Sequence, residues 1–234
     1  PNIGAIHSFS FHNYVTLFTT PELIDMIIGS IALAIGSAVL ATILGTTGAI
    51  GAFYSKKNVN GTMSVLNQIP VVNADVVTGF SLCILLVVVF GVSKNTYIPL
   101  VIGHTVLSAP FVYLAVVPKL KQVDPSLYEA ALDLGATPGY TLIHIIIPQI
   151  ASGSVSGFVM AVTLSLDDYF VATYTKPATF DTISTYVVNA TKGSQTNIKT
   201  ALWALSTIIF LIVVIVEVVM NFAPIKNEAH KEKH

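Results

Sequence analysis

The feature that most constrains this chain is an apolar segment from about Ile24 to Phe53, with no charged residue between Met26 and Ser55. A helix needs ~20 apolar residues to cross the hydrocarbon of a bilayer, so this segment is long enough to span it with a strong tilt. The chain of 234 residues is 53% hydrophobic and only 10% charged, whereas soluble domains carry roughly 25% charged residues. The sequence therefore predicts an all-α integral membrane protein.

Four further apolar segments are long enough to cross the membrane. They run from about Val65 to Phe90, Ile98 to Val117, Gln149 to Leu166 and Ala201 to Phe222. Five spans place the chain ends on opposite sides, and one side then holds seven of the eleven lysines. Because positive residues concentrate on the cytoplasmic side, we expect the loop of residues 118–148 and the C-terminus in the cytoplasm. Pro1 then begins outside, and a sixth span is expected before it.

Small residues follow one face of the first apolar segment. Ser37, Ala41, Gly45 and Ala49 recur every four residues along it. Small side chains let two helices approach closely within a bilayer. We therefore predict that this face packs against another helix, and we assign no chemistry to it.

The charged and ligand-type residues argue against several other functions. A net charge of −1 does not suit nucleic-acid binding, which needs a basic surface. The single cysteine, Cys83, excludes an internal disulfide, and His104 and His144 lack the spacing of a metal site. The chain has no Gly-rich phosphate loop of the GxxxxGK(S/T) kind. We therefore expect no catalytic residue, no metal and no bound cofactor in this chain.

A short helix is predicted in the loop between the third and fourth apolar segments. Asp124 followed by Pro125 makes a good N-cap and first helical residue. Ser126 and Glu129 could instead form a capping box, which would start the helix two residues later. Gly135 is well placed to end the helix, because glycine readily adopts the left-handed conformation found after a helix C-terminus.

One face of this short helix is apolar and rich in small residues. It is formed by Leu127, Ala130, Ala131 and Leu134, which the period of 3.6 residues brings together. A second short helix is expected to begin at Thr137 and Pro138 and to reach Ile147. An apolar face on the water side predicts a protein partner. The alternative is that both helices lie on the membrane surface.

The same loop carries a motif with fixed spacing. Glu129-Ala130-Ala131 is followed after three residues by Gly135, and after nine more by Ile145-Ile146-Ile147-Pro148. This pattern resembles the EAA loop of ABC-importer permeases, with Ile147 in place of a leucine. The resemblance implies a type I, MetI-like permease helix bundle, with five of an expected six spans present. It also implies that an ATPase subunit, which binds ATP and Mg²⁺, is coupled to the permease through Glu129, Ala130, Ala131, Leu134 and Gly135.

Acidic residues at membrane depth are costly and mark functional or paired positions. Asp167 and Asp168 follow the fourth span at its outer end, Asp75 lies inside the second span, and Glu217 lies near the inner end of the last. The adjacent pair would attract a passing polycation and repel an anion. The alternatives are that the pair caps a helix or binds Lys176, that Asp75 contacts a sister permease, and that Glu217 is an ordinary boundary residue.

A narrower resemblance covers the chain from its first loop to its last span. Thr163-Leu164-Ser165-Leu166-Asp167-Asp168 and the opening Phe9-Ser10-Phe11-His12-Asn13-Tyr14 are similar to stretches of spermidine/putrescine permeases of the PotC type. Asp75 falls where that group has a Pro-Asp pair, with Ala74 in place of the proline. The resemblance implies a polyamine pathway that includes Asp167, Asp168, Tyr169 and Asp75.

This resemblance further implies one half of a channel in the bacterial plasma membrane that works by alternating access. Its partners would be a PotB-like sister permease, two ATPase subunits and an external polyamine-binding protein. Residues 1–222 would form the permease domain, with the coupling loop at 118–148, and residues 223–234 would form a charged cytoplasmic tail.

Other functions are weighed against this one. An importer permease for another small solute stays open. So does an ion-coupled secondary transporter, in which Asp75 or Glu217 would bind a proton or Na⁺. An intramembrane aspartyl protease is disfavoured because it needs two aspartates facing each other across helices, whereas Asp167 and Asp168 are neighbours in the sequence.

Overall fold

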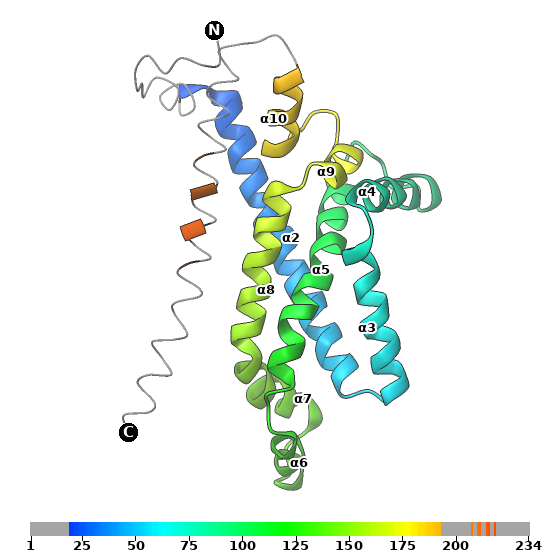
Figure 1. Cartoon of the computed structure of the whole chain (residues 1–234), viewed down its shortest axis with the longest axis vertical. Coiled ribbons are helices and arrows are strands. Elements are labelled where there is room, and N and C mark those ends of the chain that lie inside the picture. Colours follow the sequence, from blue (N-terminus) through cyan, green and yellow to red (C-terminus); the bar gives the residue numbers. More distant parts are fainter. Residues whose placement is uncertain (1–18, 193–206, 208–209, 212–213, 216–217, 219–234) are drawn as a thin grey trace. The chain divides into compact units, whose positions relative to one another are not determined.

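The computed structural model describes residues 19–192 and the single positions 207, 210, 211, 214, 215 and 218. Every regular element in this described part is a helix (Figure 1), as the composition predicts. The elements are α2 (Pro21–Phe53), α3 (Lys57–Val72), α4 (Asp75–Ile84), η1 (Leu85–Val89), α5 (Ile98–Leu120), α6 (Pro125–Asp133), α7 (Pro138–Thr141), η2 (Leu142–Ile146), α8 (Ile147–Asp167), α9 (Phe170–Thr175) and α10 (Ile183–Lys192). The elements named η are π-helical turns. The aromatic opening segment and the charged tail lie outside the described residues.

The described helices belong to two compact units. The first combines the beginning of α2, up to Ser30, with α10. Within it, Ser30 Oγ donates a hydrogen bond to the carbonyl of Met26 at 2.8 Å and accepts one from the backbone N of Ile183 at 2.9 Å. The second unit runs from Ile31 to Phe180 and contains all the residues of the candidate site.

Three of the predicted spans are long helices in the structure. The helices long and apolar enough to cross a membrane are Leu23–Phe53, Ile98–Leu120 and Pro138–Asp167. They correspond to the first, third and fourth apolar segments of the sequence. The fifth predicted span, about residues 201–222, falls outside the described residues apart from its single described positions.

The second predicted span is bent rather than straight. Its two halves, Val59–Val72 and Asp75–Val89, meet at an angle of 106°. The helix α3 continues past Pro70 to Val72, and the break lies at Asn73 and Ala74, which adopt extended conformations with ψ angles of 147° and 134°. Asp75 therefore lies in the first turn of α4. A carboxylate is favoured at a helix N-terminus by the helix dipole, which explains an acid in the middle of an apolar segment.

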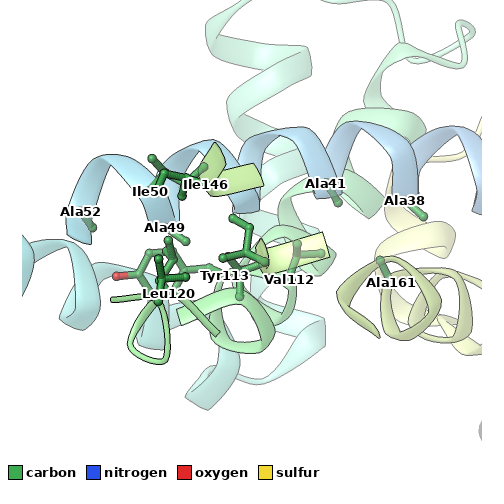
Figure 2. Close-up of a cluster of buried hydrophobic side chains, with 13 residues drawn as sticks. Ala38, Ala41, Ala49, Ile50, Ala52, Val112, Tyr113, Leu120, Ile146 and Ala161 are labelled. Atoms are coloured by element: carbon green, nitrogen blue, oxygen red, sulfur yellow. The ribbon is translucent and has the colours of Figure 1, made fainter. Parts of the chain in front are cut away.

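The core of the second unit forms where α2, α5 and α8 meet. Val112 of α5 is fully buried there, and Figure 2 shows it among the alanines of α2 and Ala161 of α8. A Cβ added to Gly45 would lie 2.7 Å from Val112 Cβ, and one added to Gly157 would lie 3.0 Å from Val112 Cα. The close approach depends on these two glycines. The predicted packing face is confirmed, since Ser37, Ala41, Gly45 and Ala49 are all buried.

The second short helix predicted in the loop is not a separate element. The helix that begins at Pro138 continues through η2 into α8 and ends at Asp167. Pro148 lies in the first turn of α8 within this continuous helix, although a proline ring clashes with the carbonyl four residues earlier in a regular helix. The wider π-turn of Leu142–Ile146 ends two residues before this proline and makes room for its ring. The loop therefore connects rigidly to the fourth span.

Candidate functional site

A cavity of about 370 Å³ lies where five helices of the second unit end or cross. Figure 1 shows α9 beside α4 at one end of α5 and α8. The cavity is lined by Pro70 and Val71 of α3, Asp75 of α4, Leu107 and Phe111 of α5, Leu164 and Asp167 of α8, and Asp168, Tyr169 and Phe170. The bend before α4 brings Asp75 to the cavity. All four residues predicted for the substrate pathway, Asp75, Asp167, Asp168 and Tyr169, thus line the same space.

The three carboxylates of this cavity differ in their surroundings. Asp75 and Asp167 are exposed, and within the described part of the chain neither side chain has a hydrogen-bond or ion-pair partner. Asp168 is only 8% exposed. Its Oδ1 accepts a hydrogen bond from the backbone N of Val171 at 3.2 Å, and its Oδ2 accepts one from Ala172 at 2.7 Å. Asp168 therefore caps the N-terminus of α9, whereas the other two acids face the open cavity.

The alternative that the acidic pair caps a helix therefore holds for Asp168 only. The cap is made by Asp168, while Asp167 remains in the last turn of α8. Lys176 donates a hydrogen bond from Nζ to the carbonyl of Phe180 at 3.0 Å. The adjacent acids point into different surroundings because α8 ends between them, and the backbone of Asp168 turns to an extended conformation with ψ of 121°.

A buried polar cluster adjoins the cavity and was not recognised in the sequence. His104 of α5 is fully buried. Its Nδ1 lies 2.8 Å from Ser165 Oγ, and its Nε2 lies 3.6 Å from Asp168 Oδ2. Ser37 of α2 donates a hydrogen bond to Ser165 Oγ at 3.3 Å. No local pattern could reveal this cluster, because Ser37 and Ser165 are 128 residues apart in the sequence and His104 is 61 residues from Ser165.

The short helix predicted in the loop is α6 (Pro125–Asp133), named the coupling helix here after its predicted role. It lies at the opposite end of α5 and α8 from α9 (Figure 1). Asp124 is its N-cap and Pro125 its first residue, as the first of the two predicted starts requires. Asp124 Oδ1 accepts hydrogen bonds from the backbone N and the hydroxyl of Ser126 at 2.9 and 2.8 Å. These hydrogen bonds hold the pKa of the Asp124 carboxyl below its usual value. The alternative start at a Ser126–Glu129 capping box is not adopted.

The coupling helix ends at Gly135 as predicted. Gly135 has a positive φ of 88°, which favours glycine because it has no Cβ. The backbone N of Gly135 donates to the carbonyl of Leu132 at 2.9 Å, and that of Ala136 donates to Ala131 at 3.0 Å. This pair of hydrogen bonds is the Schellman arrangement that satisfies the last carbonyls of a helix.

The predicted outer face of the coupling helix needs one correction. Leu127, Ala130 and Leu134 are exposed, and Leu134 is 89% exposed. Ala131, however, is only 6% exposed, so it packs against its own chain and cannot form part of an outward face. The inward face lies beside the end of α2, where the rings of Tyr128 and Tyr54 are 4.9 Å apart. Burial, and to a smaller extent the neighbouring Tyr128, raises the pKa of Tyr54.

Comparison with known proteins places this geometry in a family. Residues 45–223 match the family described as binding-protein-dependent transport system inner membrane component. The spermidine/putrescine transport system permease protein PotC of Haemophilus influenzae is 30% identical over 211 residues, covering 88% of this chain and 80% of that protein. The putrescine transport system permease protein PotI of Escherichia coli is 32% identical over 151 residues, covering 62% of this chain and 53% of that protein.

Solved structures share the fold. A bacterial ABC transporter involved in the import of the acidic polysaccharide alginate gives a TM-score of 0.69 at 18% identity, covering 92% of this chain and 85% of that one. An amino acid ABC transporter gives a TM-score of 0.62 at 17% identity, covering 92% and 97%. The chain therefore belongs to the family of binding-protein-dependent transport system inner membrane components, and it is a multi-pass membrane protein with the fold of a type I ABC-importer permease.

Proposed function

We propose that this chain forms half of the translocation path of an ATP-driven importer for polyamines such as spermidine and putrescine. The observation that carries the proposal is the cavity beside α4 and α9, whose lining by the described residues includes three carboxylates and no basic residue. The polyamine permeases among its relatives support the same cargo.

The electrostatics of the cavity favour a flexible organic cation. Two unit charges ~4 Å apart interact by roughly 4 kcal/mol at an effective dielectric constant near 20, before desolvation is subtracted. Asp75 and Asp167 offer such charges at the cavity surface. The rings of Phe111, Tyr169 and Phe170 also line the cavity, and aromatic faces attract ammonium groups within about 6 Å. An anionic cargo would be repelled by the same lining.

The coupling helix is the proposed docking element for the ATPase. Its exposed residues Leu127, Ala130 and Leu134 form an apolar surface at the end of the unit. The next helix, α7, begins at Pro138 and is continuous with α8 through η2, which gives a mechanical route from beside this surface to Asp167 at the far end of α8. ATP binding would close the ATPase dimer, move the coupling helix and reorient the spans by alternating access.

The complete transporter would contain four kinds of component. Beside this chain we propose a PotB-like sister permease, two copies of a cytoplasmic ATPase and an external polyamine-binding protein. ATP and Mg²⁺ would be bound by the ATPase, and hydrolysis would take place there rather than in this chain. In this arrangement the coupling helix and the C-terminus face the cytoplasm, and the cavity faces the outer end of the path.

Uptake measurements with charge-neutral variants test the proposal. The four components are expressed together, and spermidine and putrescine uptake is measured for D75N and D167N. Each variant is expected to raise the KM for uptake about tenfold or more, because it removes one unpartnered carboxylate from the cavity. D25N is the matched control, since Asp25 is an exposed acid of α2 that does not line the cavity.

Two results would count against the proposal in different ways. Parental uptake by both D75N and D167N would refute the electrostatic path even though the family stands. Failure of the purified chain to bind an ATPase subunit through the coupling helix would refute the proposed coupling.

A further inference from the structure

A line of polar contacts runs through the buried interior of the second unit and ends at the cavity. It passes from Ser37 on α2 to Ser165 on α8 at 3.3 Å, and from Ser165 to Nδ1 of His104 on α5 at 2.8 Å. From Nε2 of His104 it continues to Asp168 Oδ2 at 3.6 Å. All four side chains are buried. Three helices and the α8–α9 connection thus share one polar cluster.

The surroundings of the imidazole ring favour one tautomer. The Ser37 hydroxyl can donate to the Ala34 carbonyl at 3.2 Å or to Ser165 Oγ at 3.3 Å, and in either case the Ser165 hydroxyl can donate to Nδ1 of His104. The remaining ring proton then lies on Nε2, which faces the Asp168 carboxylate. The opposite tautomer would place a lone pair of Nε2 against that carboxylate, which is electrostatically unfavourable. Nε2 makes no hydrogen bond within the described part of the chain, and Asp168 Oδ2 at 3.6 Å is its ion-pair contact.

Asp168 in turn determines where α9 lies. Its carboxylate caps α9 through the backbone N–H groups of Val171 and Ala172. Val171 fits against two glycines, because a Cβ on Gly79 of α4 would lie 2.8 Å from Val171 Cα, and a Cβ on Gly103 of α5 would lie 2.8 Å from Val171 Cγ1. The short helix α9 therefore follows the end of α8 in the chain and packs against α4.

This connection sets the geometry of the cavity. Asp167 is the last residue of α8, and Asp75 is the first residue of α4. The distance between these two exposed carboxylates depends on how α9 joins the two helices. Any movement of Asp168 would tilt α9 and, through Gly79, would shift the helix that carries Asp75.

We infer that His104 is a positioning residue for the cargo: by holding Asp168 in place it sets the spacing between Asp75 and Asp167, and thereby the length of diamine that the cavity prefers. This inference rests on the proposed function of the cavity. His104 itself does not line the cavity, so it acts through Asp168 and α9 rather than by contact with the cargo.

The test compares four variants in the complete transporter. H104L removes both ring contacts, and H104Q places an amide N–H at about the position of Nε2. S165A removes the hydrogen bond to Nδ1. S108A is the matched control, because Ser108 is a buried serine on the same helix whose hydroxyl has no hydrogen-bond partner within the described residues.

Uptake is measured with putrescine and with longer and shorter diamines, at equal membrane abundance of the transporter. H104L and S165A are expected to raise the KM for putrescine about tenfold, since the polar contact of the ring with the Asp168 carboxylate is lost or misdirected. They should also change the ratio of KM values between diamines of different length, with Vmax within about twofold of the parent. H104Q should restore both quantities toward the parent, and S108A should leave them unchanged.

The outcomes separate this inference from the proposed function. If D75N and D167N raise KM but H104L and S165A keep the parental KM and the parental diamine preference, the positioning role is refuted while the cavity stands. A uniform loss of Vmax with unchanged diamine preference also refutes it, since that is the result of a merely structural role. If H104L does not accumulate in the membrane, S165A against S108A decides the question alone. If D75N and D167N have no effect, the proposed function itself fails.

Discussion

The end of the coupling helix supports a graded prediction about Gly135. This residue has a φ of 88°, and a Cβ built on it would meet nothing within 4 Å. A side chain at this position is therefore opposed by backbone conformation and not by lack of space. A residue other than glycine in the left-handed region costs about 1–2 kcal/mol, less for asparagine and more for a β-branched residue. The expected order of damage is G135N, then G135A, then G135V.

The magnitude follows from the size of the element. The coupling helix has 9 residues, and helices this short are marginal without tertiary support or good caps. A cost of 1–2 kcal/mol lowers the ratio of chains whose coupling helix ends correctly at residue 135 to chains in which this end is unfolded by roughly 5–30-fold. If the ATPase binds only the correctly ended helix, its affinity for G135A falls by up to the same factor.

The assay is polyamine uptake per ATP hydrolysed by the complete transporter in liposomes, together with the affinity of the ATPase for the permease. G139A is the matched control, because Gly139 is exposed, lies in the neighbouring α7, has no atom within 4 Å of a built Cβ and does not have a positive φ. Equal coupling in G135N, G135A and G135V would refute the reasoning. So would a G139A variant as poorly coupled as G135A.

Three further predictions address packing, docking and pH. G45V should destabilise the protein by about 1–3 kcal/mol through overpacking, because a Cβ at this position would lie 2.7 Å from a valine Cβ of α5. G51A on the same helix is the control, because a Cβ there would have no atom within 4 Å. Thermal unfolding in detergent measures the difference in stability. L134E should abolish co-purification of the ATPase while L134M preserves it, because Leu134 is 89% exposed; retention by L134E would exclude this face. The N-cap makes the stability of the start of the coupling helix depend on pH, because the folded-state pKa of Asp124 is lowered. The stabilisation that Asp124 gives is present above its unfolded-state pKa of about 3.9. It is lost as the pH falls through the folded-state pKa. The protection of the first α6 amides against hydrogen exchange, relative to the intrinsic exchange rate at each pH, should therefore fall at low pH in the parent and should lose this dependence in D124N.

The sequence by itself determined the features that depend on neighbouring residues. The cap at Asp124 and the helix end at Gly135 are made by hydrogen bonds that span only a few residues, so local rules predict them. The packing face of α2 was equally readable, because a spacing of four residues places small side chains on one side of a helix whatever the partner is. The long apolar segments predicted a membrane protein, because the length of an apolar segment can be counted in the sequence without knowing its partners.

Only the tertiary structure decided which distant groups meet. The 106° bend brings Asp75 to the end of α8, and the π-turn before Pro148 joins the coupling loop to the fourth span. The contrast between Asp167 and Asp168 depends on where α8 ends and on the buried histidine 61 residues from Ser165. Such contacts arise from the packing of whole helices, in which a glycine on one helix admits a side chain from another. A linear pattern contains the residues of this site, but their distances are set by the packed bundle.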